Sequence, residues 1–275
     1  MIKCGITGHK GVLGSFLKKK LKYRFIKFNG DITKKKDVNK WIYKNDFDYV
    51  IHLAAIVPTF KVKENFIYSK KVNYNGTKNL VDAIIKYKKK PKNFFFSSTS
   101  HVYESTNRFY KIKETDKLKP YSKYGETKLL AEKYLIKKFS KKKINFCVGR
   151  IFSFTHIKQD NSYVVPNLFQ KIKNSKKNQI FLNNLNHHRD FISIEDISKA
   201  IEMILKKNFV GVVNIGSGKK ISLLKIAQFF CKKYKIKLKT QSNMKSSFMI
   251  SNNRKLIKYG WKPKISFFHE LKKFK

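Results

Sequence analysis

Tyr124 and Lys128 lie four residues apart in a segment with helical spacing, which places both side chains on one face of a helix. A free tyrosine has a pKa of ~10 and is a poor base at neutral pH. A neighbouring ammonium group stabilises the phenolate and lowers that pKa, so the pair is suited to proton transfer. The same spacing also arises by chance, because the chain holds 14 tyrosines and 63 lysines and arginines. The rest of the sequence must therefore distinguish catalysis from coincidence.

Three glycines, Gly8, Gly11 and Gly14, follow the first apolar run with the spacing of a phosphate-binding loop. Gly8 permits a tight turn, Gly11 lets backbone amides approach a pyrophosphate, and Gly14 lets the next helix pack closely on the strand. The anion then lies at the positive end of that helix. Glycine-rich turns also occur without a ligand. A position between a clear strand and a clear helix nevertheless indicates dinucleotide binding.

The elements that must position these residues alternate between apolar strands and helical patterns. Runs rich in Ile, Val and Phe predict strands at 2–7, 24–28, 49–53, 93–98 and 144–151. Helices are expected between them, at 12–22, 35–44, 73–88 and 122–139. This alternation predicts a doubly wound α/β fold, in which helices cover both faces of a mostly parallel sheet.

The second half of the chain has a less regular pattern. Helices are predicted at 164–173, 195–206 and 222–234, and strands near 179–183 and 209–215. We expect a dinucleotide-binding domain at 1–151, with 191–216 packing back on it, and a substrate lobe made of 152–190 and 217–275. No Gly/Ser linker separates the two, so they should be interleaved.

The net charge of +46 raises the question of a nucleic-acid partner. Only five of the 63 basic residues are arginine, whose planar fork is favoured for reading bases and clamping phosphates. The lysines are spread over the whole length, among many Asn, Ile, Phe and Tyr residues. We interpret them as a solvated surface and expect no nucleic-acid binding, with a polyanion-binding surface as the alternative.

Features of export and of membrane insertion are not found in the sequence. No run of about 18 uncharged apolar residues occurs, and the first residues do not resemble a signal peptide. Three widely spaced cysteines, Cys4, Cys147 and Cys231, argue against a disulfide framework and against a metal site. Cys4 and Cys147 lie in apolar runs, where buried packing is expected. These observations predict a cytoplasmic protein.

Taken together, the motifs resemble those of the extended short-chain dehydrogenase/reductases that act on nucleotide sugars. The loop at 7–14 resembles the TGxxGxxG signature, and Tyr124 to Lys128 resembles the YxxxK pair. Segments 52–55, 73–77, 189–196, 214–218 and 260–263 resemble further motifs of the family, in the same order. The resemblance covers essentially the full chain, and the ordered set is far more specific than any one motif.

This resemblance implies an enzyme and a role for each candidate residue. Tyr124 would exchange the proton of the sugar C4 oxygen, Thr99 would hydrogen-bond that oxygen, and Lys128 would lower the Tyr124 pKa. Arg189 would contact the diphosphate of the nucleotide-sugar substrate. The implied cofactor contacts are Gly8, Lys10, Gly11, Gly14, Asp31, Ala54, Ala55, Asn73, Tyr124 and Lys128.

Two departures from the family pattern narrow the expected reaction and cofactor. Dehydratases carry acidic residues directly after the catalytic Thr, where this chain has Ser100 and His101. This leaves reduction of a 4-keto sugar or 4-epimerisation. Members that prefer NAD place an acid at the end of the second strand, where this chain has Asn29. We therefore expect NADP in preference to NAD.

Other interpretations remain open at this point. Taken alone, Asn73 is a helix cap, Thr99 an ordinary strand-end hydroxyl and Arg189 half of a surface ion pair. The rival function is a non-catalytic, dinucleotide-binding regulatory protein of the same fold. A homodimer is also expected, through the helices at 73–88 and 122–139. Its contact candidates are Leu80, Val81, Ile84, Ile85, Leu130 and Tyr134.

Overall fold

Strand β1 (Lys3–Thr7) lies inside a six-stranded sheet of order β2-β1-β3-β4-β6-β9 in the computed structural model, which describes residues 1–57 and 59–275. Its partners are β2 (Arg24–Lys27), β3 (Tyr49–His52), β4 (Asn93–Thr99), β6 (Phe146–Ile151) and β9 (Gly211–Ile215). From β2 to β6 the neighbouring strands are parallel. The predicted doubly wound α/β fold is confirmed.

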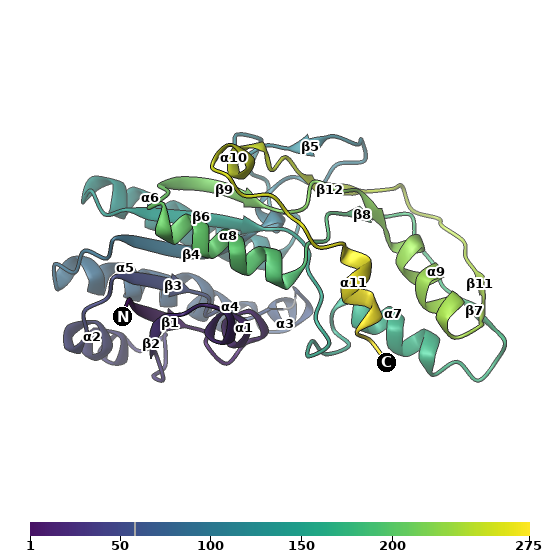
Figure 1. The fold of residues 1–275 in the computed structure, drawn as a ribbon, viewed down its shortest axis with the longest axis horizontal. Coiled ribbons are helices and arrows are strands. Elements are labelled where there is room, and N and C mark those ends of the chain that lie inside the picture. The colour runs from purple at the N-terminus through teal and green to yellow at the C-terminus, as the bar shows by residue number, and fades with distance from the viewer. Residues whose placement is uncertain (58) are drawn as a thin grey trace. The chain divides into compact units, whose positions relative to one another are not determined.

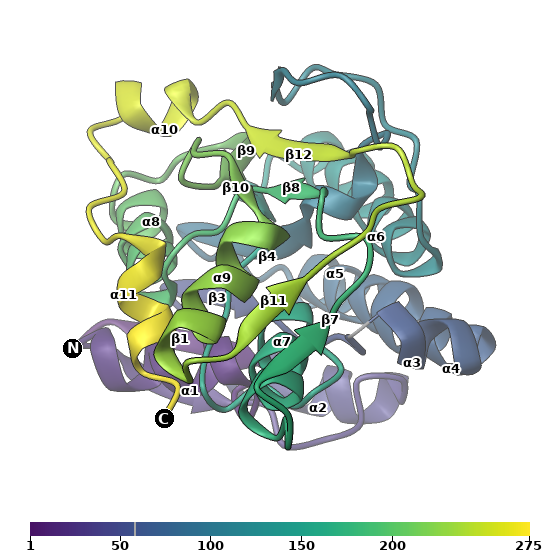
Figure 2. The same ribbon diagram turned by 90° about the vertical axis from the view of Figure 1, so that its right-hand side faces the viewer.

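Helices flank this sheet on both sides. Figures 1 and 2 show α8 (Ile194–Lys206) on one face and α5 (Gly76–Lys86) and α6 (Lys123–Lys141) on the other. Helices α1 (Val12–Lys20) and α2 (Lys35–Lys44) follow the first two strands. Helix α6 starts at Ser122, whose hydroxyl accepts a hydrogen bond from Gly125 N–H at 3.1 Å and caps the first turn.

The predicted helix at 73–88 differs from the observed one. Short helices α3 (Thr59–Glu64) and α4 (Phe66–Lys70) precede it, and a π-helical turn, η1 (Lys71–Asn75), leads into α5. The α-helix itself begins at Gly76, where a side chain would collide with Ile32. Contact with a residue far away in the sequence therefore influences where this helix runs.

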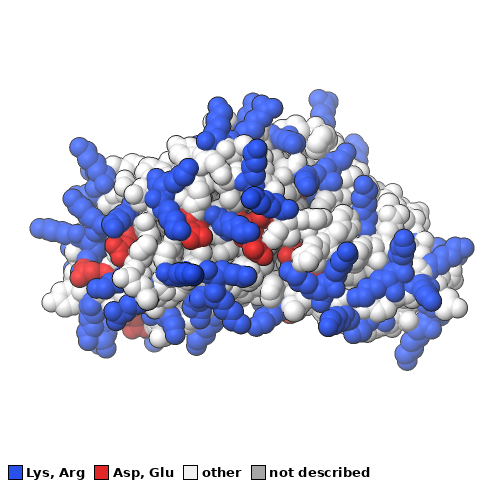
Figure 3. Space-filling model, viewed as in Figure 1, with Lys and Arg blue, Asp and Glu red and all other residues white. Residues whose placement is uncertain are grey.

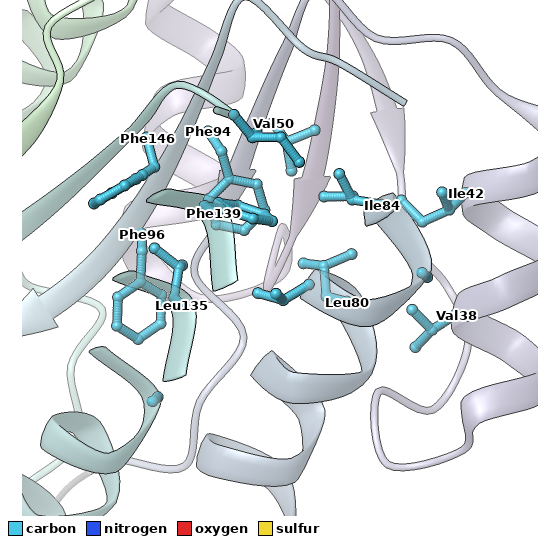
Figure 4. Packing of buried hydrophobic residues seen from close by; sticks show 14 of the residues in the cluster. Val38, Ile42, Val50, Leu80, Ile84, Phe94, Phe96, Leu135, Phe139 and Phe146 are labelled. Carbon is cyan, nitrogen blue, oxygen red and sulfur yellow. The ribbon is translucent and has the colours of Figure 1, made fainter. Parts of the chain in front are cut away.

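The core of the sheet domain is built from aromatic and branched side chains on β3, β4, α5 and α6. Figure 4 shows Phe94 and Phe139 packed together, with their ring centres 5.2 Å apart, and Leu80 and Ile84 beside them. Leu80, Val81 and Ile84 are at most 1% exposed. Their expected role as dimer contacts is therefore wrong, because they already pack against the chain's own sheet. The dimer itself stays a prediction.

The chain divides into two compact units. The first is Met1–Glu104, Lys117–Ile151 and Ile197–Val213, and the second is Ser105–Asp116, Phe152–Asp196 and Asn214–Lys275. We expected the segment 105–116 in the first domain. It falls in the second unit because β5 (Lys111–Ile112) pairs with β12 (Phe248–Ser251). The paired residues Lys111 and Ile250 are 139 positions apart in the sequence.

The second unit contains two small sheets, of order β10-β8-β12-β5 and β11-β7. Its remaining strands are β7 (Gln179–Phe181), β8 (His188–Arg189), β10 (Ile221–Ser222) and β11 (Lys237–Lys239). Its helices are α7 (Val164–Lys173), α9 (Leu223–Lys233), α10 (Arg254–Lys258) and α11 (Phe267–Lys272). A separate core of aromatic residues, including Phe169, Phe230 and Phe274, joins α7 to α9.

Lysine and arginine side chains cover the surface seen in Figure 3 without gathering at one place. This distribution agrees with the interpretation of the lysines as a solvated surface. Within residues 1–57 and 59–275, no helix is long and apolar enough to span a membrane. Cys4, Cys147 and Cys231 are buried free thiols, as expected for Cys4 and Cys147 from their apolar surroundings.

Candidate active site

The three loop glycines have different structural requirements. Gly8 has a φ of +70°, and a Cβ there would lie 2.7 Å from the backbone of Leu53 and Ala54. A Cβ on Gly14 would collide with the carbonyl oxygen of Gly8. At Gly11 a Cβ would meet only that same oxygen, at a tolerable 3.4 Å. Gly8 and Gly14 are thus required by the fold itself, whereas Gly11 has open space beside it.

The loop leads into the N-terminus of α1 with its anion-binding features exposed. Gly11 is the N-cap residue and has no side chain with which to cap the first N–H groups of the helix. The first turn carries no acidic residue. Uncapped N–H groups, the positive end of the helix and open space at Gly11 fit the pyrophosphate of a dinucleotide.

A pocket of about 410 Å³ opens next to this loop. Its walls are Gly8, His9, Lys10, Phe28, Asn29, Gly30, Asp31, Ile32, Ala54, Ile56, Tyr68 and Val72. Four of the cofactor residues proposed from the sequence, Gly8, Lys10, Asp31 and Ala54, therefore line one pocket. Asp31 accepts hydrogen bonds from the N–H and the hydroxyl of Thr33, at 2.9 and 2.8 Å, and both bonds lower its pKa.

His9 is a pocket residue that the sequence analysis missed. Its side chain is 7% exposed, and burial lowers its pKa, as do the charges of Lys18, Lys10 and Lys27. Of these three lysines, Lys10 also lines the pocket. The abundance of lysine throughout the chain gave no signal that would have singled out Lys18 or Lys27.

His52 connects the first strand with α5 through directed hydrogen bonds. The Thr77 hydroxyl donates its single proton to the Asn73 carbonyl at 2.7 Å, so it accepts from His52 Nε2 at 2.9 Å. His52 Nδ1 then accepts from the Thr7 hydroxyl at 2.6 Å. Burial and the nearby Lys128 lower the His52 pKa to about 3. His52 is thus a neutral packed residue, in agreement with its interpretation from the sequence.

Asn73 links the loop after β3 to the helix that carries Tyr124. Its amide oxygen accepts from Ile56 N–H at 2.7 Å, and its amide nitrogen donates to the Thr127 hydroxyl at 3.0 Å. Thr127 in turn donates to the Tyr124 carbonyl at 2.8 Å. The interpretation of Asn73 as a helix cap is therefore wrong, since its side chain is engaged in joining two distant segments. Ala55 lies in the same loop, next to Ile56.

A close approach of backbone brings the segment after Thr99 to the start of α6. A Cβ on Gly125 would collide with the carbonyl oxygen of His101, so a glycine directly after Tyr124 is needed for this contact. The His101 ring lies edge-on to the Tyr124 ring, with centres 5.6 Å apart. Thr99 ends β4, is 6% exposed and accepts from His101 N–H at 3.2 Å. Its hydroxyl retains a proton to donate.

Lys128 is buried inside the protein, unlike the lysines on the surface. Its side chain is 1% exposed, and Nζ lies 4.1 Å from the centre of the Phe96 ring in β4. Burial lowers the Lys128 pKa to about 7, while the carboxylate of Glu132 opposes that change. A lysine near its own ionisation point, one helical turn after Tyr124, is suited to altering the charge on that phenol.

Arg189 belongs to the second unit. Its Nη1 donates to the carbonyl of His188 at 2.8 Å and to the hydroxyl of Ser247 at 3.0 Å. The adjacent Asp190 is fully buried and accepts several hydrogen bonds, one of them from Ser217 N–H at 2.7 Å. These contacts hold the short strand β8 in place. Arg189 is therefore held at a defined position in this unit.

Comparisons with known proteins cover most of the chain. A family profile described as GDP-mannose 4,6 dehydratase matches residues 13–273. A candidate UDP-glucose 4-epimerase of Methanocaldococcus jannaschii is 33% identical over 71% of this chain, and the match spans 63% of the epimerase, slightly under two thirds. A GDP-6-deoxy-D-talose 4-dehydrogenase of Aggregatibacter actinomycetemcomitans is 26% identical over 84% of this chain and 79% of that enzyme.

A solved structure shows the same fold. RMD from Pseudomonas aeruginosa, complexed with NADPH, has a TM-score of 0.89 to this chain at 20% sequence identity. The superposition covers 98% of this chain and 96% of that protein. Both units therefore have counterparts in a solved dinucleotide-bound protein.

Proposed function

This chain belongs to the extended short-chain dehydrogenase/reductases, in the group of nucleotide-sugar epimerases, dehydratases and dehydrogenases, and on that premise we propose that it reduces a 4-keto group of a nucleotide-activated sugar. The observation that carries this proposal is the buried Lys128 one helical turn from Tyr124. A lysine that is present only because the whole surface is rich in lysine would be exposed to solvent.

Each candidate residue has a defined task in the proposed reaction. Tyr124 donates a proton to the C4 oxygen, and the Thr99 hydroxyl hydrogen-bonds that oxygen. Lys128 stabilises the phenolate that remains on Tyr124. The bound nicotinamide supplies the hydride that reduces C4. The Gly8–Gly14 loop holds the pyrophosphate of the cofactor, and Arg189 pairs with the diphosphate of the substrate.

Dehydration is disfavoured by the side chains that follow Thr99. Ser100 is 3% exposed, and His101 Nδ1 lies 3.1 Å from the Ser122 hydroxyl while its ring stacks on Tyr121. Neither supplies a carboxyl group for removing water from the sugar. The similarity to a 4-dehydrogenase supports oxidation–reduction at C4, and the similarity to a 4-epimerase makes epimerisation the second candidate.

A panel of nucleotide sugars and their 4-keto derivatives tests this function. With a 4-keto substrate, we expect net consumption of the reduced cofactor, measured as loss of its absorbance, together with a 4-hydroxy product. Interconversion of two sugars without net cofactor change would identify a 4-epimerase instead. Cofactor binding without turnover of any panel member would favour the non-catalytic alternative.

We expect NADPH to bind at least about tenfold more tightly than NADH, or about 1.4 kcal/mol. Asn29 stands where an acid would repel a 2′-phosphate, Lys10 lines the pocket, and the charges of Lys18 and Lys27 act on His9 in its wall. Fluorescence titration with both cofactors measures the difference. Replacement of Lys27 by Met should weaken NADPH binding and leave NADH binding unchanged.

The matched control is Lys22→Met, which removes an exposed lysine just before β2. It should change neither affinity. Tighter binding of NADH by the unmodified protein would contradict the expected cofactor preference.

A further inference from the structure

Glu132 and Arg150 form an ion pair inside the first unit, although 18 positions separate them in the sequence. Arg150 Nη2 lies 2.8 Å from Glu132 Oε2, and Arg150 Nε lies 3.2 Å from both carboxylate oxygens. The arginine and glutamate side chains are 3% and 1% exposed. Solvent therefore screens their charges far less than it screens the surface lysines.

Two hydroxyl groups hold the pair in place. Ser98 donates to a Glu132 oxygen, and the Tyr103 hydroxyl accepts from Arg150 Nη1 at 2.9 Å. The guanidinium carbon also lies 4.9 Å from the centre of the Tyr103 ring. Ser98 directly precedes Thr99 on β4, and Tyr103 directly follows the 3-10 turn η2 (Ser100–Val102). The network therefore joins β4, η2, α6 and β6.

Stability alone does not explain why two charges are buried here. Moving a charged group out of water costs several kcal/mol per ion. The attraction between the two buried charges offsets a free energy of about that size. Apolar residues of similar size often serve stability equally well or better. The position of the pair, beside the candidate catalytic residues, indicates another role.

Glu132 lies one helical turn after Lys128 and is the carboxylate that raises the Lys128 pKa against the effect of burial. On β3, His52 is neutral and therefore contributes no charge to the surroundings of Lys128. On β6, Arg150 is the neighbouring cation.

The other elements packed on α6 direct their polar groups elsewhere. His101 of η2 contacts Ser122 and the Tyr124 ring. Asp82 of α5 accepts a hydrogen bond from the Tyr134 hydroxyl at 2.5 Å. Within the described residues, Glu132 is thus the negative charge that acts on Lys128.

We propose that Glu132 and Arg150 are positioning residues, whose opposite charges balance one another beside Lys128, so that neither charge alone sets the ionisation of the Tyr124–Lys128 pair. This inference rests on the proposed function, because it assumes that Tyr124 and Lys128 work as a proton-transfer pair. Removing the carboxylate alone leaves the Arg150 cation uncompensated. The Tyr124–Lys128 pair should then lose its proton at a lower pH. Removing both charges should restore the balance.

The test follows ionisation of Tyr124 in the protein with NADP⁺ bound, through the near-ultraviolet absorbance of phenolate between about pH 5 and pH 9. Tyr124→Phe identifies the absorbance step that belongs to Tyr124. Because Tyr124 and Lys128 are coupled, the step reports an apparent value of the pair. Glu132→Gln should move it to lower pH by about one pH unit or more. The double variant Glu132→Gln, Arg150→Met should return it to within about half a pH unit of the unmodified protein.

Circular dichroism establishes that each variant is folded. If Glu132→Gln does not fold, Arg150→Met decides the question, because loss of the cation should move the step to higher pH. A step that stays at one pH in all variants, or moves equally in the single and double variants, overturns the inference. A protein without any Tyr124 step contradicts the proposed catalytic pair instead, so the two failures are distinguishable.

Discussion

Replacement of Tyr124 by Phe is expected to lower turnover by about two to four orders of magnitude, the usual contribution of general acid–base catalysis. Phenylalanine keeps the ring that packs edge-on against His101 but removes the proton-transfer group. Cofactor affinity should therefore stay nearly unchanged. The measurement is kcat with the 4-keto substrate found in the panel, together with a cofactor titration.

The matched test of the second residue compares two lysines on α6. Lys128 is 1% exposed, whereas Lys133 is exposed on the same helix. Lys128→Met should weaken cofactor binding and reduce turnover, because it removes the charge next to Tyr124. Lys133→Met should do neither. Equal behaviour of both variants would mean that the spacing of Tyr124 and Lys128 is a coincidence of composition.

Replacement of Gly11 by Val is expected to weaken cofactor binding by at least about 100-fold, which corresponds to about 3 kcal/mol. The built Cβ at Gly11 meets only Gly8 O, at 3.4 Å, so the protein itself accommodates a side chain there. A branched side chain would instead occupy the space that the pyrophosphate needs at the N-terminus of α1. Calorimetric titration with NADPH measures the loss.

Thermal unfolding separates this effect from a folding defect. The Gly11→Val variant should lose only a few degrees in Tm, since Val is a poorer N-cap residue than Gly. Gly8→Ala and Gly14→Ala should lower Tm much more, because their side chains would meet backbone atoms. Unchanged NADPH affinity in a folded Gly11→Val protein would remove the basis for a dinucleotide site at this loop.

The positions of the main strands and helices could be predicted from the sequence because their causes are local. Apolar periodicity located β1 to β4, α1 and α6 to within a few residues, and helices α2 and α7 at their observed bounds. The loop glycines and the spacing of Tyr124 and Lys128 are likewise local patterns. Each of them places side chains relative to the adjacent backbone, whatever the rest of the chain does.

Relations between distant segments were decided only by the tertiary structure. Periodicity marked Leu80 and Ile84 as apolar, but only packing against the sheet showed that they are covered. The need for glycine at position 125 arises from the His101 carbonyl, which lies on another element.

The electrostatic surroundings of the site depend on the same long-range packing. Nothing in the local sequence joins Glu132 to Arg150 or brings the charge of Lys27 to bear on His9. Charge–charge interactions depend on distance through space and on burial, and both are set by how strands and helices from different parts of the chain come together. The sequence by itself therefore determined which residues can do the chemistry, and the tertiary structure determined the charges around them.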